Sequence, residues 1–188
     1  MKTLRKTAEE AYLKHVSKII SREAWIDGFI SGIQYKKEYS QSIELCGLLW
    51  DTENLAIGSY EKDGRRYLTW EEAMDAAWSV GKRLPTQYEW RALYNLGSTW
   101  DDERKGRWFG GNHNSDHKGS LFLPANGVHY YYSDKSVNVG SNGYYWSSSQ
   151  FSNDHNLTSG LSFGLGYVYP SCYYNGNYGF SVRCVQNK

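Results

Sequence analysis

Two helix-start signals, one at Thr69 and one at Thr86, constrain the fold of this 188-residue chain more than any other feature. Each threonine precedes a glutamate by three residues, in the sequences TWEE and TQYE. This spacing is typical of a capping box, in which the hydroxyl and the carboxylate bind each other's backbone N–H groups. Gly81 and Gly97 follow as helix stops. The pattern predicts two helices, to about residues 80 and 96, joined by a tight Gly-Lys-Arg-Leu-Pro connection.

The rest of the chain divides into three stretches of different pattern. Residues 1–40 have apolar side chains at helical spacing and predict a helical arm, which either packs on its own domain or serves oligomerisation or docking. Residues 42–67 predict short strands separated by the turn-type clusters DTEN and EKDG. After Trp108 the helical periodicity vanishes and predicts loops with short strands. On the first capped helix, the spacing predicts a buried face of Ala73, Met74, Ala77 and Trp78.

Charge and hydropathy exclude several classes of partner. The formal net charge is +1, from 21 basic and 20 acidic residues, so no nucleic-acid partner is expected. The longest apolar runs are a few residues, far short of the ~20 that span a bilayer, so no membrane insertion is expected. The first residues lack the apolar stretch of a signal peptide, so secretion by that route is not indicated and the localisation stays open.

Cofactor and metal chemistry find little support in the sequence. Cys46, Cys172 and Cys184 are odd in number and far apart, which argues against a disulfide framework or a zinc ribbon. The segment HNSDH at residues 113–117 has ligand-type side chains, but its Gly/Asn-rich setting favours a solvated loop. No zinc-protease, phosphate-loop or serine-elbow motif occurs. We therefore expect no cofactor, no metal and no catalytic residue.

Residues 69–95 resemble the formylglycine-generating and sulfatase-modifying family, in the Gly-Lys-Arg-Leu-Pro-Thr step and the Glu-Trp pair that ends at Trp90. The resemblance implies a scaffold in which Trp90 is buried. An oxidase of that family needs two neighbouring cysteines shortly before its terminal Gly-Phe-Arg-Cys segment, and here only Cys172 lies there. Cys184 belongs to the terminal segment itself, where we expect a small buried side chain. An enzyme of this type stays the third hypothesis.

The end of the chain carries a second resemblance, in GYYWSSSQ at residues 143–150 and YGFSVRCV at residues 178–185. These motifs are similar to C-type-lectin-fold proteins that include the variable proteins of diversity-generating retroelements and phage tropism determinants. A broader set of bacterial domains, named after a major paralogous family, has the same tail. The resemblance implies an α+β, C-type-lectin-like fold with a loop-rich C-terminal half at residues 41–188, and the N-terminal helical arm at residues 1–40. The calcium-ligand triplets of sugar-binding lectins are absent.

The composition of residues 141–182 indicates a recognition surface. Tyr, Ser, Gly and Asn make up 27 of these 42 residues, as in antibody binding loops. The alternative is a set of ordinary turns with tyrosines on half-buried strands. Residues 151–182 also contain no Lys, Glu, Gln, Met or Trp, although these types make up 38 of the 188 residues. Retroelement mutagenesis replaces adenines in Asn codons, and no such codon can become any of these five types, whereas Cys is among its products.

The resemblance divides the region at about residues 144–182 into a fixed frame and variable positions. The frame contains Trp146, which we expect to be buried, together with Phe163 and Phe180. The positions that match the variable set, and are expected to bind ligand, are Phe151, Asn153, Asp154, His155, Gly160, Ser162, Gly164, Tyr167, Tyr169, Cys172, Tyr173, Tyr174, Asn175, Asn177 and Tyr178. The five tyrosines of this set are expected to face solvent on one contiguous surface.

The sequence therefore predicts a non-enzymatic ligand-binding protein with a diversified surface. The expected partner is a protein or glycan on a cell surface, met from a phage tail or a bacterial envelope. The second hypothesis is a non-diversified binding or structural module of the same fold.

Overall fold

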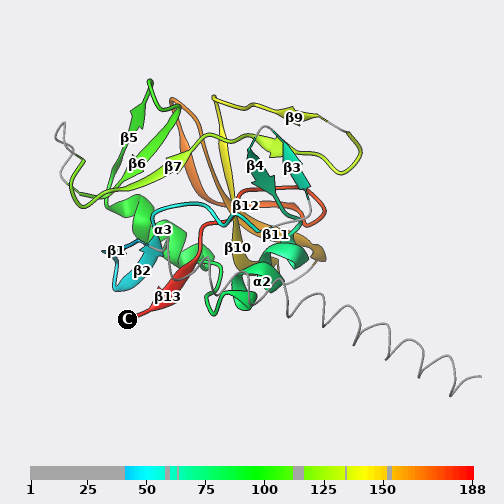
Figure 1. Cartoon of the computed structure of the whole chain (residues 1–188), viewed down its shortest axis with the longest axis horizontal. Coiled ribbons are helices and arrows are strands. Elements are labelled where there is room, and N and C mark those ends of the chain that lie inside the picture. Colours follow the sequence, from blue (N-terminus) through cyan, green and yellow to red (C-terminus); the bar gives the residue numbers. More distant parts are fainter. Residues whose placement is uncertain (1–40, 58–59, 63, 112–116, 134, 152–153) are drawn as a thin grey trace, which may run out of the picture. The chain divides into compact units, whose positions relative to one another are not determined.

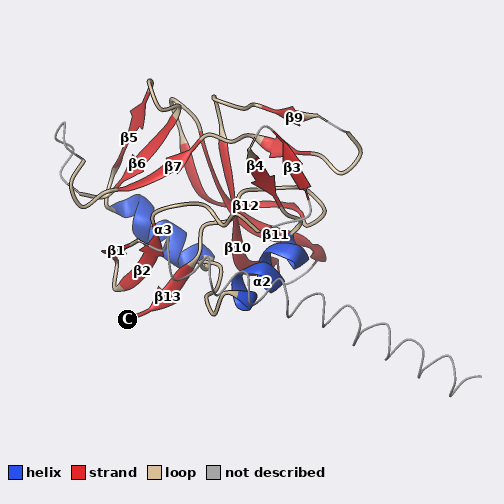
Figure 2. Ribbon diagram, viewed as in Figure 1, coloured by secondary structure: helices blue, strands red, loops and turns tan. Residues whose placement is uncertain are grey.

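The computed structural model describes residues 41–57, 60–62, 64–111, 117–133, 135–151 and 154–188, without the side chains of residues 60–62 and 155 (Figure 1). The described chain is mostly strand, with two helices (Figure 2). The predicted N-terminal arm at residues 1–40 lies outside the described residues, as do His113 and Asn153.

The two helices begin at the two predicted caps. They are α2 (Trp70–Ser79) and α3 (Gln87–Asn95). In each, the threonine hydroxyl accepts a hydrogen bond from the backbone N–H of the glutamate, and the carboxylate accepts one from the threonine N–H, at 2.9 Å for Thr69 and 2.7 Å for Thr86. Gly81 and Gly97 follow with φ values of 70° and 84°, where a glycine avoids the strain of a side chain. Both predicted helices and both capping boxes are confirmed.

The buried face of α2 differs from the predicted one at Trp78. Trp78 is 76% exposed, so its predicted burial is wrong, whereas Ala73 and Ala77 are buried as expected. Ala76 and Val80 complete the buried side. At 100° per residue these four positions form one stripe, and Trp78 lies well outside it. Because the stripe consists mainly of alanines, the helix packs closely through small side chains.

The connection between the helices fixes them to the rest of the fold. Lys82 is buried and forms a salt bridge with Asp51. Arg83 donates two hydrogen bonds to the carboxylate of Glu89, at 2.7 and 2.8 Å. The carbonyl of Pro85 accepts a hydrogen bond from the backbone N–H of Ser148, at 2.8 Å. The Gly-Lys-Arg-Leu-Pro step therefore acts as scaffold.

Glu89 makes the stability of this connection depend on pH. Burial alone would raise the pKa of its carboxyl, but the hydrogen bonds from Arg83 and from the Thr86 N–H outweigh it, so the pKa lies below its ordinary value of 4.5. A lowered pKa adds stability above pH 4.5 that is lost as the pH falls through the folded-state pKa. We expect Glu89→Gln to be less stable than the wild type near neutral pH. Urea unfolding curves should show this difference shrinking below pH 4.5.

Glu103, an exposed carboxyl, provides the control for this pH dependence. Glu103→Gln should have the urea midpoint of the wild type near neutral pH. If the difference in unfolding free energy between Glu89→Gln and the wild type stays constant down to pH 3, the Glu89 carboxyl is not the source of the pH dependence.

The strands form small antiparallel sheets. They are β1 (Ser42–Leu45), β2 (Leu48–Asp51), β3 (Tyr60–Lys62), β4 (Arg65–Tyr67), β5 (Ser98–Asp101), β6 (Gly106–Phe109), β7 (Leu121–Pro124), β8 (Val128–His129), β9 (Ser136–Val137), β10 (Gly143–Phe151), β11 (Asp154–Phe163), β12 (Val168–Asn175) and β13 (Val185–Asn187). Their orders are β1-β2-β13, β5-β6-β7 and β10-β11-β12, with the hairpins β3-β4 and β8-β9. The sheet β1-β2-β13 thus pairs the beginning of the described chain with its end.

The segment between β12 and β13 connects several of these units. Phe180 exchanges backbone hydrogen bonds with Leu68, and Gly179 does so with His129. Val185 pairs with Arg83 in the same way. One extended segment therefore holds the helix connection and the β8–β9 hairpin together.

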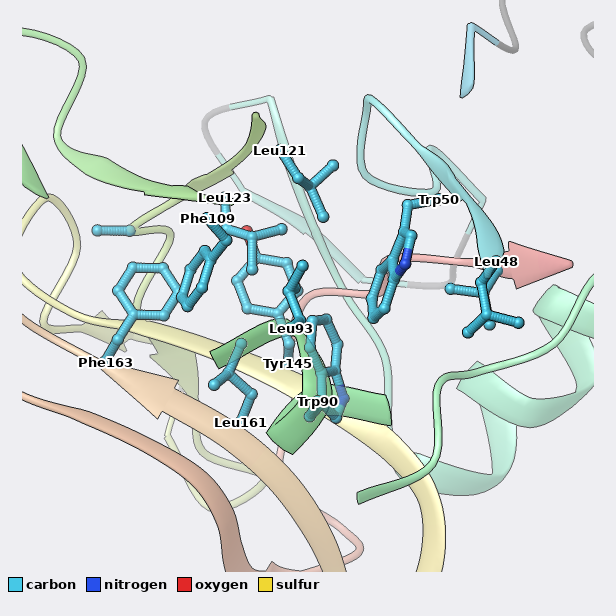
Figure 3. Close-up of a cluster of buried hydrophobic side chains, with 12 residues drawn as sticks. Leu48, Trp50, Trp90, Leu93, Phe109, Leu121, Leu123, Tyr145, Leu161 and Phe163 are labelled. Atoms are coloured by element: carbon cyan, nitrogen blue, oxygen red, sulfur yellow. The ribbon is translucent and has the colours of Figure 1, made fainter. Parts of the chain in front are cut away.

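Two hydrophobic clusters lie on opposite faces of the sheet β10-β11-β12. The first includes Trp90 and Leu93 from α3 and Tyr145 and Phe163 from the sheet, which point toward one another (Figure 3). The second cluster is built around Trp146, whose ring stacks on Phe180 with centroids 4.1 Å apart, and also contains Cys184. The predicted burial of Trp90, Trp146, Phe163, Phe180 and Cys184 is confirmed.

The prediction of a loop-rich C-terminal half is wrong in part. The longest strands of the described chain, β10, β11 and β12, lie in that half. Their tyrosines favour strands, but their glycines and asparagines are of types depleted in strands. Strand pairing and the packing of tyrosine rings over small residues, both of which are non-local, stabilise them.

A close approach within this sheet makes Gly143 sensitive to substitution. A Cβ atom at Gly143 would lie 2.2 Å from Cζ of the buried Phe163 ring. We expect Gly143→Ala to lower the free energy of unfolding by about 1–3 kcal/mol, because the ring has to move within a packed cluster. At Gly166 an added Cβ would meet nothing within 4 Å, so Gly166→Ala is the control and should be neutral or slightly stabilising in thermal unfolding. Equal midpoints for both variants would contradict this packing.

Candidate ligand-binding surface

The register of β10, β11 and β12 decides which side chains share a face. Side chains that are paired across antiparallel strands point to the same side. Leu161 pairs with Tyr145, and both belong to the cluster around Trp90. Gly160 pairs with Trp146 and with Cys172, which places these residues on the opposite face. We call this second side the tyrosine face, because it carries Tyr144, Tyr167, Tyr169 and Tyr174.

An irregularity in β12 sets which tyrosines reach this face. Gly160 pairs with Cys172, whereas Ser162 pairs with Tyr169, so β12 has one extra residue over this interval. Pro170, which has no N–H to donate, lies at this point of an edge strand, where proline is tolerated. The extra residue places Tyr169 on the same side as Cys172 and Tyr174.

The tyrosine face continues beyond the sheet into the β8–β9 connection. Tyr130 and Tyr132 stack with centroids 5.2 Å apart, and Tyr130 meets Tyr178 edge-on at 4.9 Å. Tyr131 lies 6.2 Å from Tyr178. The backbone pairing of His129 with Gly179 brings these two segments together. Tyr131 and Tyr132 are 61% and 67% exposed.

The rings of the tyrosine face and those of the β8–β9 connection together form what we call the tyrosine surface. Its members are Tyr130, Tyr131, Tyr132, Tyr144, Tyr167, Tyr169, Tyr174 and Tyr178. Phe180, which is fully buried, supports it from below through contacts with Tyr144, Tyr174 and Tyr178 at 5.2, 5.0 and 6.4 Å. The rings thus have fixed positions on a packed core.

The hydroxyls of Tyr130, Tyr167 and Tyr174 stay protonated at neutral pH because their pKa values are raised. Burial raises the pKa of Tyr130, and the neighbouring Tyr144, Tyr132 and Tyr178 raise it further. Burial also raises the pKa of Tyr174. These hydroxyls can both donate and accept hydrogen bonds, while the rings supply apolar contact area.

The structure distributes the predicted binding residues over three levels of exposure. Asp154, Tyr169, Tyr173 and Asn177 are exposed, and Phe151, Tyr167, Cys172, Tyr174, Asn175 and Tyr178 are half-buried. Gly160, Ser162 and Gly164 are buried. Asn153 and the side chain of His155 lie outside the described part of the chain.

The prediction that Gly160, Ser162 and Gly164 contact ligand is wrong for this structure. A Cβ at Gly160 would lie 3.4 Å from the ring of Tyr174, and one at Gly164 would lie 2.7 Å from the ring of Tyr167. Ser162 is 3% exposed, and its side chain bonds to that of Tyr174. Tyrosine rings cover these small residues, which make room for the rings.

Tyr173 corrects the expectation of one contiguous face for the five tyrosines. Tyr173 pairs with Ser159, an odd number of residues from Ser162, so it points to the side opposite Tyr169. There it packs against Phe151, with ring centroids 4.8 Å apart. The extra residue near Pro170 is the cause. The expected exposure is confirmed for Tyr169 and Tyr173, whereas Tyr167, Tyr174 and Tyr178 are half-buried.

A polar cleft lies beside the tyrosine face at the start of α2. It has a volume of about 140 Å³. The residues that line it are Thr69, Trp70, Glu71, Gln150, Asn156, Thr158, Asn175, Gly176 and Asn177. Thr158 pairs with Tyr174 across β11 and β12, so the cleft adjoins the tyrosine face. Asn175 and Asn177 belong to the predicted binding set.

Sequence reasoning missed the contribution of Tyr130, Tyr131 and Tyr132. The signal was present, since three consecutive tyrosines cannot all be buried on one side of an extended segment. The lining of the cleft by Gln150 and Asn156 had no local signal. It follows from the pairing of distant strands.

Within the described residues, we find no cluster of metal ligands and no reactive thiol at Cys184. No group of three His, Cys, Asp or Glu side chains there could hold a metal ion. Burial raises the pKa of the Cys184 thiol to about 12. His117 instead stacks on Trp108, with centroids 4.4 Å apart. Among the described helices, none is long and apolar enough to cross a membrane.

The comparison with known families gives one match. Residues 95–185 match the family model of a domain of unknown function, DUF8237. The matched segment includes every predicted binding residue and the whole tyrosine surface, but neither α2 nor the helix connection. No curated protein and no solved structure matches the chain.

Proposed function

We propose that this chain is a non-enzymatic ligand-binding protein with a C-type-lectin-like fold. It presents a diversified, Tyr/Ser/Gly/Asn-rich surface to a protein or glycan on a cell surface. The observation that carries the proposal is the tyrosine surface. Its exposed rings Tyr131, Tyr132 and Tyr169 lie against other tyrosines, of which Tyr130 and Tyr178 pack on the second cluster. Rigid tyrosines provide large amphipathic contact area at low entropic cost, which is how antibody loops bind.

The division between frame and exposed positions supports diversification. Asp154, Tyr169, Tyr173 and Asn177 of the predicted variable set are exposed, whereas Trp146 and the other frame aromatics are buried. Changes at exposed positions seldom alter stability by more than ~0.5 kcal/mol. A surface of this kind tolerates many sequences on one fold.

A non-diversified module of the same fold is the second candidate, and a specific observation favours it. Tyr167 and Tyr174 cover buried residues of the sheet, and Tyr174 also packs on Phe180. These two positions have a structural role that limits variation. A sulfatase-modifying enzyme is disfavoured because only Cys172 lies where that family needs two neighbouring cysteines, and Cys184 is buried in the second cluster with a raised thiol pKa.

The gene itself tests diversification. A neighbouring reverse transcriptase and a near-copy of the last ~100 bases, differing only at adenines, should accompany it. Their absence would favour the non-diversified module.

Binding by the full chain tests the surface. The probe is the fluorescently labelled protein, measured by flow cytometry on a panel of bacterial isolates. We expect the triple variant Tyr131→Ser, Tyr132→Ser, Tyr169→Ser to lose at least about tenfold in affinity for any isolate that the wild type binds, because three anchoring rings are removed. The matched control is Tyr88→Ser with Tyr94→Ser, two exposed tyrosines on α3. Equal losses in both variants would contradict the proposal.

A further inference from the structure

The polar cleft at the start of α2 has unused hydrogen-bonding capacity. Within the described part of the chain, the side-chain amides of Gln150, Asn156 and Asn177 make no hydrogen bond to the protein. Each amide offers two donor hydrogens and one acceptor oxygen. Glu71, which is exposed, adds an acceptor-only carboxylate. The lining therefore suits a ligand whose groups both donate and accept.

A buried hydroxyl without a hydrogen-bond partner also lies at the cleft. Thr158 is 1% exposed, and its hydroxyl oxygen has no hydrogen-bond partner in the described structure. A buried hydroxyl without a partner is costly, and a polar ligand that reached it would remove that cost. Beside Thr158 lies Trp70, whose ring forms the aromatic wall of the cleft. Its indole N–H donates to the carbonyl of Ser147 at 2.7 Å, which fixes the position of the ring.

The charge of the lining restricts the ligand. Glu71 is the one ionisable side chain among the described lining residues, and no Lys or Arg is among them. An anionic ligand would meet a carboxylate with no cation to offset it. The charge of the lining therefore argues against an anionic ligand.

The volume of the cleft restricts the ligand further. Its volume of about 140 Å³ is small beside the ~300–1,000 Å³ of a pocket for a drug-sized ligand. One small ring fits, and a folded loop of a protein does not. A pyranose has hydroxyls that donate and accept around its rim, together with an apolar face for the aromatic wall.

We propose that this cleft binds a single neutral sugar unit of the ligand, with Gln150, Asn156, Asn177 and Glu71 bonding its hydroxyls. The inference rests on the proposed function, since Asn177 is one of the predicted variable positions. It narrows the proposed ligand, which was a protein or a glycan, to a glycan. The tyrosine face beside the cleft then receives the neighbouring sugar units.

The test uses the full chain and an array of immobilised neutral and sialylated glycans, followed by calorimetric titration with the free neutral oligosaccharides that bind. We expect neutral glycans to bind. The double variant Asn156→Ala, Asn177→Ala should bind them at least about tenfold more weakly, since two ligand hydrogen bonds are lost. The matched control is Asn95→Ala, an exposed asparagine at the end of α3, which should stay within about twofold. Equal thermal midpoints of all three proteins show that the fold is intact.

The outcomes separate this inference from the proposed function. Binding of sialylated glycans alone, or neutral-glycan binding that the double variant leaves unchanged, overturns the sugar site. If no glycan binds while cell binding depends on Tyr131, Tyr132 and Tyr169, the sugar site falls and the proposed function stands. If glycan binding depends on the cleft while the tyrosine variants bind cells normally, the sugar site stands and the tyrosine surface loses its role.

Discussion

Replacing Arg183 with methionine should lower the free energy of unfolding by at least about 4 kcal/mol, a large part of the ~5–15 kcal/mol that stabilises a typical domain. Arg183 is fully buried. Its Nη1 donates to the carbonyls of Asp51, Thr52 and Phe122, at 3.0, 2.8 and 3.0 Å. Its Nε and Nη2 both donate to Oδ1 of Asn54, at 3.0 and 2.6 Å. One guanidinium therefore joins the end of β2, the loop that follows and β7.

The size of this effect follows from the groups left behind. Methionine fills most of the volume of Arg183, so the loss does not come from a cavity. Four acceptor oxygens would lose their donor, and each buried polar group without a partner costs ~1–3 kcal/mol. Burial lowers the pKa of the Arg183 guanidinium, but an arginine stays protonated in proteins and its donors stay available.

Urea unfolding monitored by tryptophan fluorescence would measure the change. Arg183→Lys keeps the charge but cannot reproduce the planar fork, so it should also be strongly destabilised. The control is Arg91→Met, an exposed position on α3, which should leave the midpoint unchanged. An Arg183→Met midpoint close to the wild type would show that these carbonyls find other donors.

The helices could be predicted because their signals are local. The capping boxes at Thr69 and Thr86 depend on residues only three positions apart. The helix ends are also marked locally, by the glycine that follows each helix. The buried face of α2 could not be read in the same way. Trp78 is the more apolar candidate, but it is 76% exposed, whereas Ala76 is buried. Packing distance, which no local pattern records, decided between them.

The binding surface could be predicted only in part, for a similar reason. Composition and resemblance indicated the right segment and its tyrosines, of which Tyr169 and Tyr173 are the most exposed. The side of the sheet on which each one lies depends on the extra residue near Pro170, which changes the register between two strands. Tyr130 lies beside Tyr178 because the backbone of His129 pairs with that of Gly179, 50 residues further along the chain. Neither feature is visible in a window of sequence.

Phe163→Ser should be the most damaging change within the predicted variable region, at about 4 kcal/mol or more. The Phe163 ring is fully buried and packs against Phe109 and Tyr145, with centroids 5.9 and 6.0 Å apart. Removing a buried phenylalanine side chain costs ~3–5 kcal/mol, and the serine hydroxyl adds an unpaired polar group in an apolar cluster. The effect is read as the shift in the urea midpoint.

The four exposed positions of the same segment provide the contrast. Replacing Asp154, Tyr169, Tyr173 and Asn177 together with serine should cost less than about 2 kcal/mol, because all four positions are exposed. A surface that accepts four changes while one interior ring accepts none has the physical division that diversification requires. If the quadruple variant unfolds as readily as Phe163→Ser, the segment is core throughout. A diversified surface then has no physical basis, even where the tyrosines bind a ligand.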